Sequence, residues 1–177
     1  MLRGQQTFVE VNVTNQGGAA AENIQVLLPD APWLKLASPA TISALAPGQS
    51  AKVTLALTPD ATLPLTEYQG NVFLDAAGND GDLSLPFNFR ATSEAVGSLR
   101  INVENELTYF AEGAPKLAGA TVILRDYFTG NEVRRVITDQ TGMVGWDGIA
   151  QGAYKLEIKA DKHSSFEQII QLDAGEI

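Results

Sequence analysis

Four oxygen-bearing side chains that could bind a metal ion are grouped around one expected turn. Asp75, Asn79, Asp80 and Asp82 fall within eight consecutive residues, and Ca²⁺ takes carboxylate and carbonyl oxygens from loops of this kind. The spacing is not that of an EF-hand, which requires a later glutamate. An Asn-Asp-Gly sequence is also typical of a β-hairpin turn. The sequence therefore predicts either a calcium site or a plain hairpin at these residues.

Two tyrosines are candidates for binding a polysaccharide. Tyr109 and Tyr127, each followed by a phenylalanine, lie in stretches without regular patterning, where we expect partly exposed rings. An exposed aromatic ring offers a broad apolar face with a polar tip, which suits stacking on a sugar ring. Trp33 lies between Pro32 and Leu34, where we expect it to plug an end of the sandwich, and Trp146 continues the expected strand of Met143 and Val144. We predict that both pack in the interior instead.

The only histidine, His163, lies close in sequence to Asp161, Ser164 and Ser165. A hydrolytic triad needs a nucleophile, a base and an orienting acid that converge in space beside an oxyanion hole, and no Gly-x-Ser-x-Gly elbow is present. A polar loop between two strands explains these residues better. The 21 acidic residues are scattered along the chain rather than paired as glycoside hydrolysis requires. We therefore predict that the chain is not an enzyme.

The charge balance excludes two classes of partner. Twelve basic and 21 acidic residues give a net charge of −9, and without a basic stripe the chain lacks the charge pattern of a nucleic-acid-binding protein. No apolar run reaches the ~20 residues that cross a bilayer, so we expect no membrane insertion in this segment. The absence of cysteine excludes disulfides and thiol nucleophiles. Apart from the calcium ion, no cofactor is predicted.

Short alternating apolar stretches separated by turn residues dominate the chain, which favours an all-β fold. Pro86 inside one of these stretches indicates an edge strand or a bulge. A polar break near residues 91–97 divides the chain, so we expect two tandem antiparallel β-sandwiches at residues 1–93 and 95–177. Each is large enough to bury a core. The expected strands are residues 7–13, 23–28, 51–58, 68–74, 83–89, 98–103, 120–126, 132–138, 143–146, 154–160 and 166–172.

Residues 164–172 allow two interpretations. Their first four residues fit a helix capping box, and the apolar residues that follow have helical spacing. Phe166, Ile170 and Leu172 also fit a strand, although Gln168 falls on the same face. We favour the strand because β-branched residues suit it.

The second module carries a recognisable pattern from Gly119-Ala120 onward. A turn follows at Thr138-Asp139-Gln140-Thr141-Gly142, and Gly152-Ala153-Tyr154 precedes a further strand. The pattern covers about 80 residues and resembles the carboxypeptidase regulatory-like domain, a transthyretin-like β-sandwich akin to the B-type repeats of collagen adhesins. The resemblance implies a non-catalytic accessory or spacer domain. Ile158 stands where adhesin relatives hold the glutamate that catalyses a Lys–Asn isopeptide bond, so no such bond is expected.

The first module is similar to a different group of β-sandwiches. Asn15-Gln16-Gly17-Gly18 follows an alternating strand, Pro32-Trp33 comes next, and Leu45-Ala46-Pro47-Gly48 precedes another strand. This order resembles the NEW3 and CARDB-like families of bacterial immunoglobulin-like domains. The resemblance implies a module that links, spaces or presents other domains.

These observations together predict a structural or interaction segment of a larger secreted or cell-surface protein of a prokaryote. Its expected partners are the neighbouring domains of the same polypeptide, with a further protein or a polysaccharide as ligand. The alternative is a polysaccharide-binding module assisted by calcium. A transthyretin-like or immunoglobulin-like sandwich hosts many roles, so the fold alone does not decide between the two.

Overall fold

The computed structural model describes residues 1–76, 83–108, 110, 112–113 and 115–175. All regular structure in these residues is β-strand, and the strands pair antiparallel throughout, so the all-β expectation is confirmed. Among them no helix is long and apolar enough to span a membrane. The chain divides into two compact units, unit 1 from Met1 to Thr92 and unit 2 from Ser93 to Ile177.

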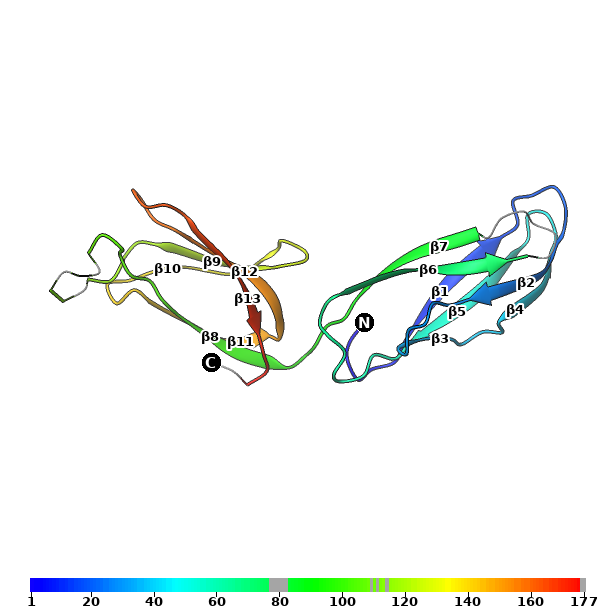
Figure 1. Cartoon of the computed structure of the whole chain (residues 1–177), viewed down its shortest axis with the longest axis horizontal. Coiled ribbons are helices and arrows are strands. Elements are labelled where there is room, and N and C mark those ends of the chain that lie inside the picture. Colours follow the sequence, from blue (N-terminus) through cyan, green and yellow to red (C-terminus); the bar gives the residue numbers. More distant parts are fainter. Residues whose placement is uncertain (77–82, 109, 111, 114, 176–177) are drawn as a thin grey trace. The chain divides into compact units, whose positions relative to one another are not determined.

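Unit 1 is a sandwich of two sheets (Figure 1). One sheet has the strand order β1-β5-β3 and the other the order β4-β2-β6-β7. Pro86 lies in β7, at the edge of the larger sheet, where its missing N–H interrupts no ladder; the edge-strand expectation is confirmed. The strands are β1 (Thr7–Thr14), β2 (Ala21–Leu27), β3 (Leu34–Leu36), β4 (Thr41–Leu45), β5 (Ser50–Leu57), β6 (Glu67–Asp75) and β7 (Leu83–Arg90).

An aromatic group fills part of the core of unit 1. Trp33 is buried, and its ring meets Tyr68 edge-on at 5.3 Å and both Phe87 and Phe89 at 6.1 Å between centroids. Phe87 in turn stacks on Phe89 at 5.1 Å. The prediction that Trp33 is a core residue is confirmed. The other buried members of this core are Val26, Leu34, Val53, Leu55, Leu57 and Val72.

Unit 2 has a four-stranded sheet of order β10-β9-β12-β13 and a two-stranded sheet of order β11-β8. The buried side chains between them include Val122, Leu124 and Ile149. A register shift interrupts the β8–β11 pairing between Trp146 and Ile149, where Gly148 has a φ of 67°. The strands are β8 (Val96–Asn102), β9 (Thr121–Asp126), β10 (Glu132–Ile137), β11 (Met143–Ala150), β12 (Gly152–Lys159) and β13 (Phe166–Leu172).

The ambiguous C-terminal segment is a strand. β13 pairs antiparallel with β12 over seven residues, from Gly152 opposite Leu172 to Ile158 opposite Phe166, so the strand interpretation is confirmed. Directly opposite residues share a face of the sheet. The inward face of β13 therefore carries Phe166, Gln168 and Ile170, with the glutamine among the apolar residues.

Aspartates close several turns by accepting hydrogen bonds from the backbone that follows. Asp139 Oδ1 accepts from the Thr141 N–H at 2.8 Å and from its hydroxyl at 2.5 Å, while Gly142 takes a φ of 65°. The turn expected at these residues is confirmed. Asp60 and Thr62 repeat the arrangement. These acids therefore have a structural reason for their places in turns.

Candidate functional site

The predicted calcium-binding turn falls largely outside the described residues. Asp75 ends β6 as an exposed residue opposite Gln25 of β2, whereas Asn79, Asp80 and Asp82 lie outside the described residues. Where the chain is described, no group of three or more His, Asp or Glu side chains is placed to hold a metal ion. β6 and β7 pair from Leu74 opposite Leu83, so the two strands do form a hairpin. Calcium binding at its turn stays a prediction.

Only one of the two candidate tyrosines lies within the described residues. Tyr109 lies outside the described residues. Tyr127 follows β9, is about half exposed, and meets the ring of its neighbour Phe128 edge-on at 5.2 Å with an interplanar angle of 82°. Two perpendicular rings do not offer a flat platform for a sugar chain. The role of Tyr127 in ligand binding stays a prediction.

The histidine loop does not assemble a triad. His163 Nδ1 lies 2.7 Å from the main-chain carbonyl of Asp161, so the contact is to a carbonyl rather than to a carboxylate. Because a carbonyl oxygen only accepts hydrogen bonds, Nδ1 carries the proton and Nε2 of the neutral ring is an acceptor. That Nε2 is buried and has no hydrogen-bond partner among the described residues. Sequence reasoning identified the histidine but not this arrangement.

A cleft opens into the core of unit 2 beside this loop. It has a volume of about 690 Å³ and lies between β8 and β13. Its floor includes Leu156 and Ile158 of β12, and His163 lies at its rim. The remaining walls come from Leu99, Ile101 and Val103 on one side and from Phe166, Gln168 and Ile170 on the other.

A charged ladder covers the outward face of the four-stranded sheet. Glu157 of β12 is only 7% exposed and its carboxylate lies 3.4–3.5 Å from Lys155, Lys159 and Arg125. Burial on its own would raise the pKa of Glu157, but hydrogen bonds from Lys155 and Lys159 outweigh it, and the pKa is lowered below the ordinary 4.5. The ladder continues through Lys155 to Glu167 at 2.9 Å. The alternation of charge along β12 was the sequence signal for this face, and sequence reasoning missed it.

The first and last residues of unit 1 are joined by a short parallel pairing, here called the terminal clamp. Leu2 and Thr92 form a parallel bridge. The Thr92 N–H donates to the Met1 carbonyl at 2.9 Å, and the Arg3 N–H donates to the Thr92 carbonyl at 3.0 Å. The Met1 amino group donates to the Arg90 carbonyl at 2.6 Å. The clamp therefore closes unit 1 through hydrogen bonds between residues 89 to 91 positions apart in the sequence.

Further contacts anchor the N-terminal side of the terminal clamp to the body of unit 1. The Gly4 N–H donates to the Pro59 carbonyl at 2.8 Å. The guanidinium of Arg3 donates through Nε to the Leu63 carbonyl. The Ala91 N–H donates to the Thr66 carbonyl at 2.9 Å, which anchors the other side. Both halves of the clamp are thus tied to the loop at residues 59–66.

One family model matches part of unit 1. Residues 1–69 match the family model described as "NPCBM-associated, NEW3 domain of alpha-galactosidase". This match supports the resemblance of the N-terminal module to NEW3 domains. It covers less than half of the chain and does not reach unit 2, whose resemblance to the carboxypeptidase regulatory-like domain stays a prediction. No curated protein matches the chain.

Solved structures with a similar arrangement are distant. The CupB2 chaperone of Pseudomonas aeruginosa is 14% identical with a TM-score of 0.35, and the match covers 94% of this chain and 93% of that one. The TIE protein of Bacillus anthracis is 16% identical with a TM-score of 0.39, over 97% and 39%. The pilus adhesin RrgA of Streptococcus pneumoniae is 13% identical with a TM-score of 0.33, over 88% and 26%. The chain thus spans well under half the length of the last two.

Proposed function

We propose that this chain is a non-catalytic structural and interaction segment of a larger secreted or cell-surface protein, where it spaces neighbouring domains and withstands tension between them. The observation that carries the proposal is the terminal clamp. It joins the two ends through which force would enter and leave unit 1. The family description of NEW3 as a domain of alpha-galactosidase supports an accessory place beside other domains.

The direction of the clamp decides how it responds to force. Its two segments run parallel, so pulling outward on Met1 and on the chain beyond Thr92 draws them in opposite directions along their length. The hydrogen bonds between them are then sheared together rather than broken one after another. Each contributes only ~1 kcal/mol at equilibrium. The clamp therefore adds more to the unfolding force than to the free energy of unfolding.

The surface of the chain suits an extended, soluble array. The charged residues of both units pair mainly at exposed positions, as Lys52 does with Glu10 at 2.9 Å. Exposed pairs add little stability, but a net charge of −9 keeps adjacent chains apart in solution. A spacer needs a charged surface that keeps it in solution, and such a surface is compatible with many neighbouring domains.

Force spectroscopy on two proline variants tests the proposal. Thr92→Pro removes the N–H that donates to the Met1 carbonyl. Ala37→Pro is the matched control, because it also removes one backbone hydrogen bond, from the Ala37 N–H to the Thr54 carbonyl at 2.8 Å, but at a site away from the clamp. With handles at the N-terminus and at Ser93→Cys, we expect Thr92→Pro to lower the unfolding force of unit 1 clearly and Ala37→Pro to leave it nearly unchanged. Equal forces for the two variants would refute the mechanical role.

A second candidate function, binding of an uncharged polysaccharide, is favoured by one observation. Gln69, Asn71 and Phe73 follow one another on the outward face of β6, and Asn88 of β7 lies opposite Gln69. Amides both donate and accept hydrogen bonds without carrying charge, and Phe73 is 39% exposed. Charged residues, Glu67 and Asp75, stand at the two ends of this face, and the neutral stretch between them suits a hydroxyl-rich chain.

Thermal unfolding with neutral polysaccharides, with calcium and with a chelator tests this second function and the calcium prediction together. A ligand present at 100 times its dissociation constant stabilises by about 2.7 kcal/mol. Phe73→Ser should abolish a polysaccharide shift, whereas Phe8→Ser should not, because Phe8 is 57% exposed on the other sheet. A shift that survives Phe73→Ser would exclude this face. A shift in the unfolding temperature with calcium alone would show that the chain binds the metal ion and not the polysaccharide.

A further inference from the structure

The cleft of unit 2 is a gap at the open side of the sandwich. The Gly175 N–H donates to the Val96 carbonyl at 3.1 Å, so β8 and the end of β13 meet there. From that point the two strands diverge (Figure 1), and Val103 and Phe166 are among the residues that line the cleft. Its apolar lining is core surface of the unit, with Ile101, Val103 and Leu156 each less than a tenth exposed.

Both strands that flank the cleft are sheet edges. In the described part of unit 2, the only strand that pairs with β13 is β12, and the only strand that pairs with β8 is β11. Each therefore presents unpaired backbone N–H and C=O groups on its outer side, which another strand can pair with. An extended peptide that adds to such an edge gains main-chain hydrogen bonds, and pockets for alternate side chains select its sequence.

Part of the inward face of β13 is exposed, at the place that a further strand would cover. Phe166 is 49% exposed although it lies opposite the inward-facing Ile158. Ile169, on the outward face of the same strand, is 60% exposed. A large apolar side chain on an inner sheet face is normally buried by the opposite sheet. Its exposure here marks the space that an added strand would fill.

The rim of the cleft holds an acceptor that lacks a donor. Nε2 of His163 is buried without a partner in the described residues, and in the neutral ring, whose Nδ1 donates to the Asp161 carbonyl, Nε2 is an acceptor. A buried polar atom left unpaired is costly. A backbone N–H or a hydroxyl of an incoming peptide would supply the missing donor.

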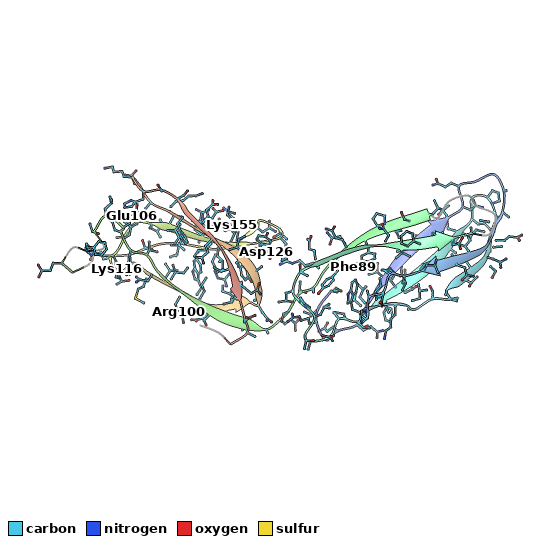
Figure 2. All side chains as sticks on the ribbon, viewed as in Figure 1. Phe89, Arg100, Glu106, Lys116, Asp126 and Lys155 are labelled. Atoms are coloured by element: carbon cyan, nitrogen blue, oxygen red, sulfur yellow. The ribbon has the colours of Figure 1, made fainter. Side chains whose placement is uncertain are left out.

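The end of the cleft at Val103 is acidic, because Glu104 and Glu106 line it. Figure 2 shows Glu106 and Lys116 on the segment that follows β8. Glu104 is paired with Lys116, whereas no ion pair reaches Glu106 within the part of the chain that is described. A second copy of this chain also carries a charge of −9 and is disfavoured by repulsion. A foreign peptide with a lysine or arginine at this end is favoured instead.

We propose that this cleft binds an extended segment of another polypeptide, which enters as a strand beside β13 with apolar residues at alternate positions and a basic residue at the acidic end. From Phe166 to Ile170 the strand rises about 14 Å, so about five residues of the partner lie in the cleft. This inference does not depend on the mechanical role of unit 1, since it concerns only unit 2.

Peptide titration of the full ¹⁵N-labelled chain tests the proposal. The probes are acetylated peptides of sequence Lys-Val-Thr-Val-Thr-Val-Thr, its reverse, and a scrambled form, Lys-Val-Val-Val-Thr-Thr-Thr, that breaks the alternation. We expect the alternating peptides to shift amide resonances of β8 and β13 and the scrambled one not to. Phe166→Ser should weaken binding about tenfold, the effect of losing one apolar anchor. Ile169→Ser is the matched control and should leave the affinity unchanged.

Charge provides a second variant that leaves the apolar lining intact. Glu106→Gln should weaken binding of the lysine-bearing peptide and have no effect on a peptide with threonine in place of lysine. The proposal is overturned if neither alternating peptide causes shifts at millimolar concentration, or if the shifts lie outside the cleft. It is also overturned if the chain dimerises by sedimentation and Phe166→Ser abolishes that dimer, because the occupant would then be a second copy.

Discussion

Gly70 lies directly beneath an aromatic ring in unit 1, and replacing it with alanine should push that ring out of place. Gly70 of β6 is the register partner of Phe87 in β7. A Cβ added at Gly70 would lie 2.6 Å from Cζ of Phe87 and 3.0 and 3.3 Å from its two Cε atoms. Carbon atoms in ordinary contact are about 3.5–4.0 Å apart, so the ring must retreat by about 1 Å.

The ring has little room to retreat because it is held on two sides. It stacks on Phe89 at 5.1 Å and meets Trp33 edge-on at 6.1 Å. Overpacking of this kind costs about 1–3 kcal/mol, and the stiffer unfolded chain of an alanine variant returns about 0.4–1 kcal/mol. We therefore expect Gly70→Ala to lower the free energy of unfolding of unit 1 by about 1–2 kcal/mol.

Urea unfolding of the full chain measures this effect. Trp146→Phe leaves Trp33 as the only tryptophan, so its fluorescence reports unit 1. Gly18→Ala is the control, since an added Cβ there meets no atom within 4 Å. In a Phe87→Leu background the cost of Gly70→Ala should disappear. The reasoning is refuted if Gly70→Ala is neutral, or if its cost is the same in both backgrounds.

Two further predictions concern unit 2. Thr138 is buried, and its hydroxyl accepts from the Ala120 N–H at 2.9 Å and donates to the Leu117 carbonyl at 2.6 Å. Thr138→Val should lower the free energy of unfolding by denaturant by about 1–3 kcal/mol, and Thr138→Ser should lower it clearly less. Equal losses for the two variants would contradict the hydrogen-bond argument. The folded-state pKa of Glu157 is lowered, so the unfolded chain binds more protons below pH 4.5 and stability is lost as pH falls through the folded pKa. The melting temperature of unit 2 between pH 7 and pH 3 should therefore fall less in Glu157→Gln, and an identical pH profile would exclude Glu157 as a contributor.

Local sequence patterns predicted the longer strands because alternation and turn residues act within a few positions of one another. They missed β3 and β4. β3 has only three residues, which are too few to show an alternation of apolar and polar residues. In β4 the small Ala44 stands at a position where a larger apolar residue would have made the alternation visible. The extension of β11 beyond Trp146 was also missed, because Asp147 and Gly148 interrupt the alternation at a register shift.

The functional features depend on distant parts of the chain, which is why sequence reasoning did not find them. The terminal clamp joins residues about 90 positions apart, and Leu2 and Thr92 carry no local signal of pairing. The cleft depends on β8 and β13 both being edges, a property of the topology. Gln168 among the apolar residues of β13 was the one visible hint, since a polar residue on an inner face suits a wall that solvent reaches.

The unfolding force of unit 1 in two pulling directions tests the central claim most directly. The chain has no cysteine, so introduced cysteines give unique handles. One pair, the N-terminus and Ser93→Cys, shears the terminal clamp. The other pair, Gln16→Cys and Ser50→Cys, opens the antiparallel β1–β5 ladder from the end where Thr14 pairs with Ser50. We predict a clearly higher force in the first direction, and an equal or lower force there would contradict a tension-bearing role for this protein.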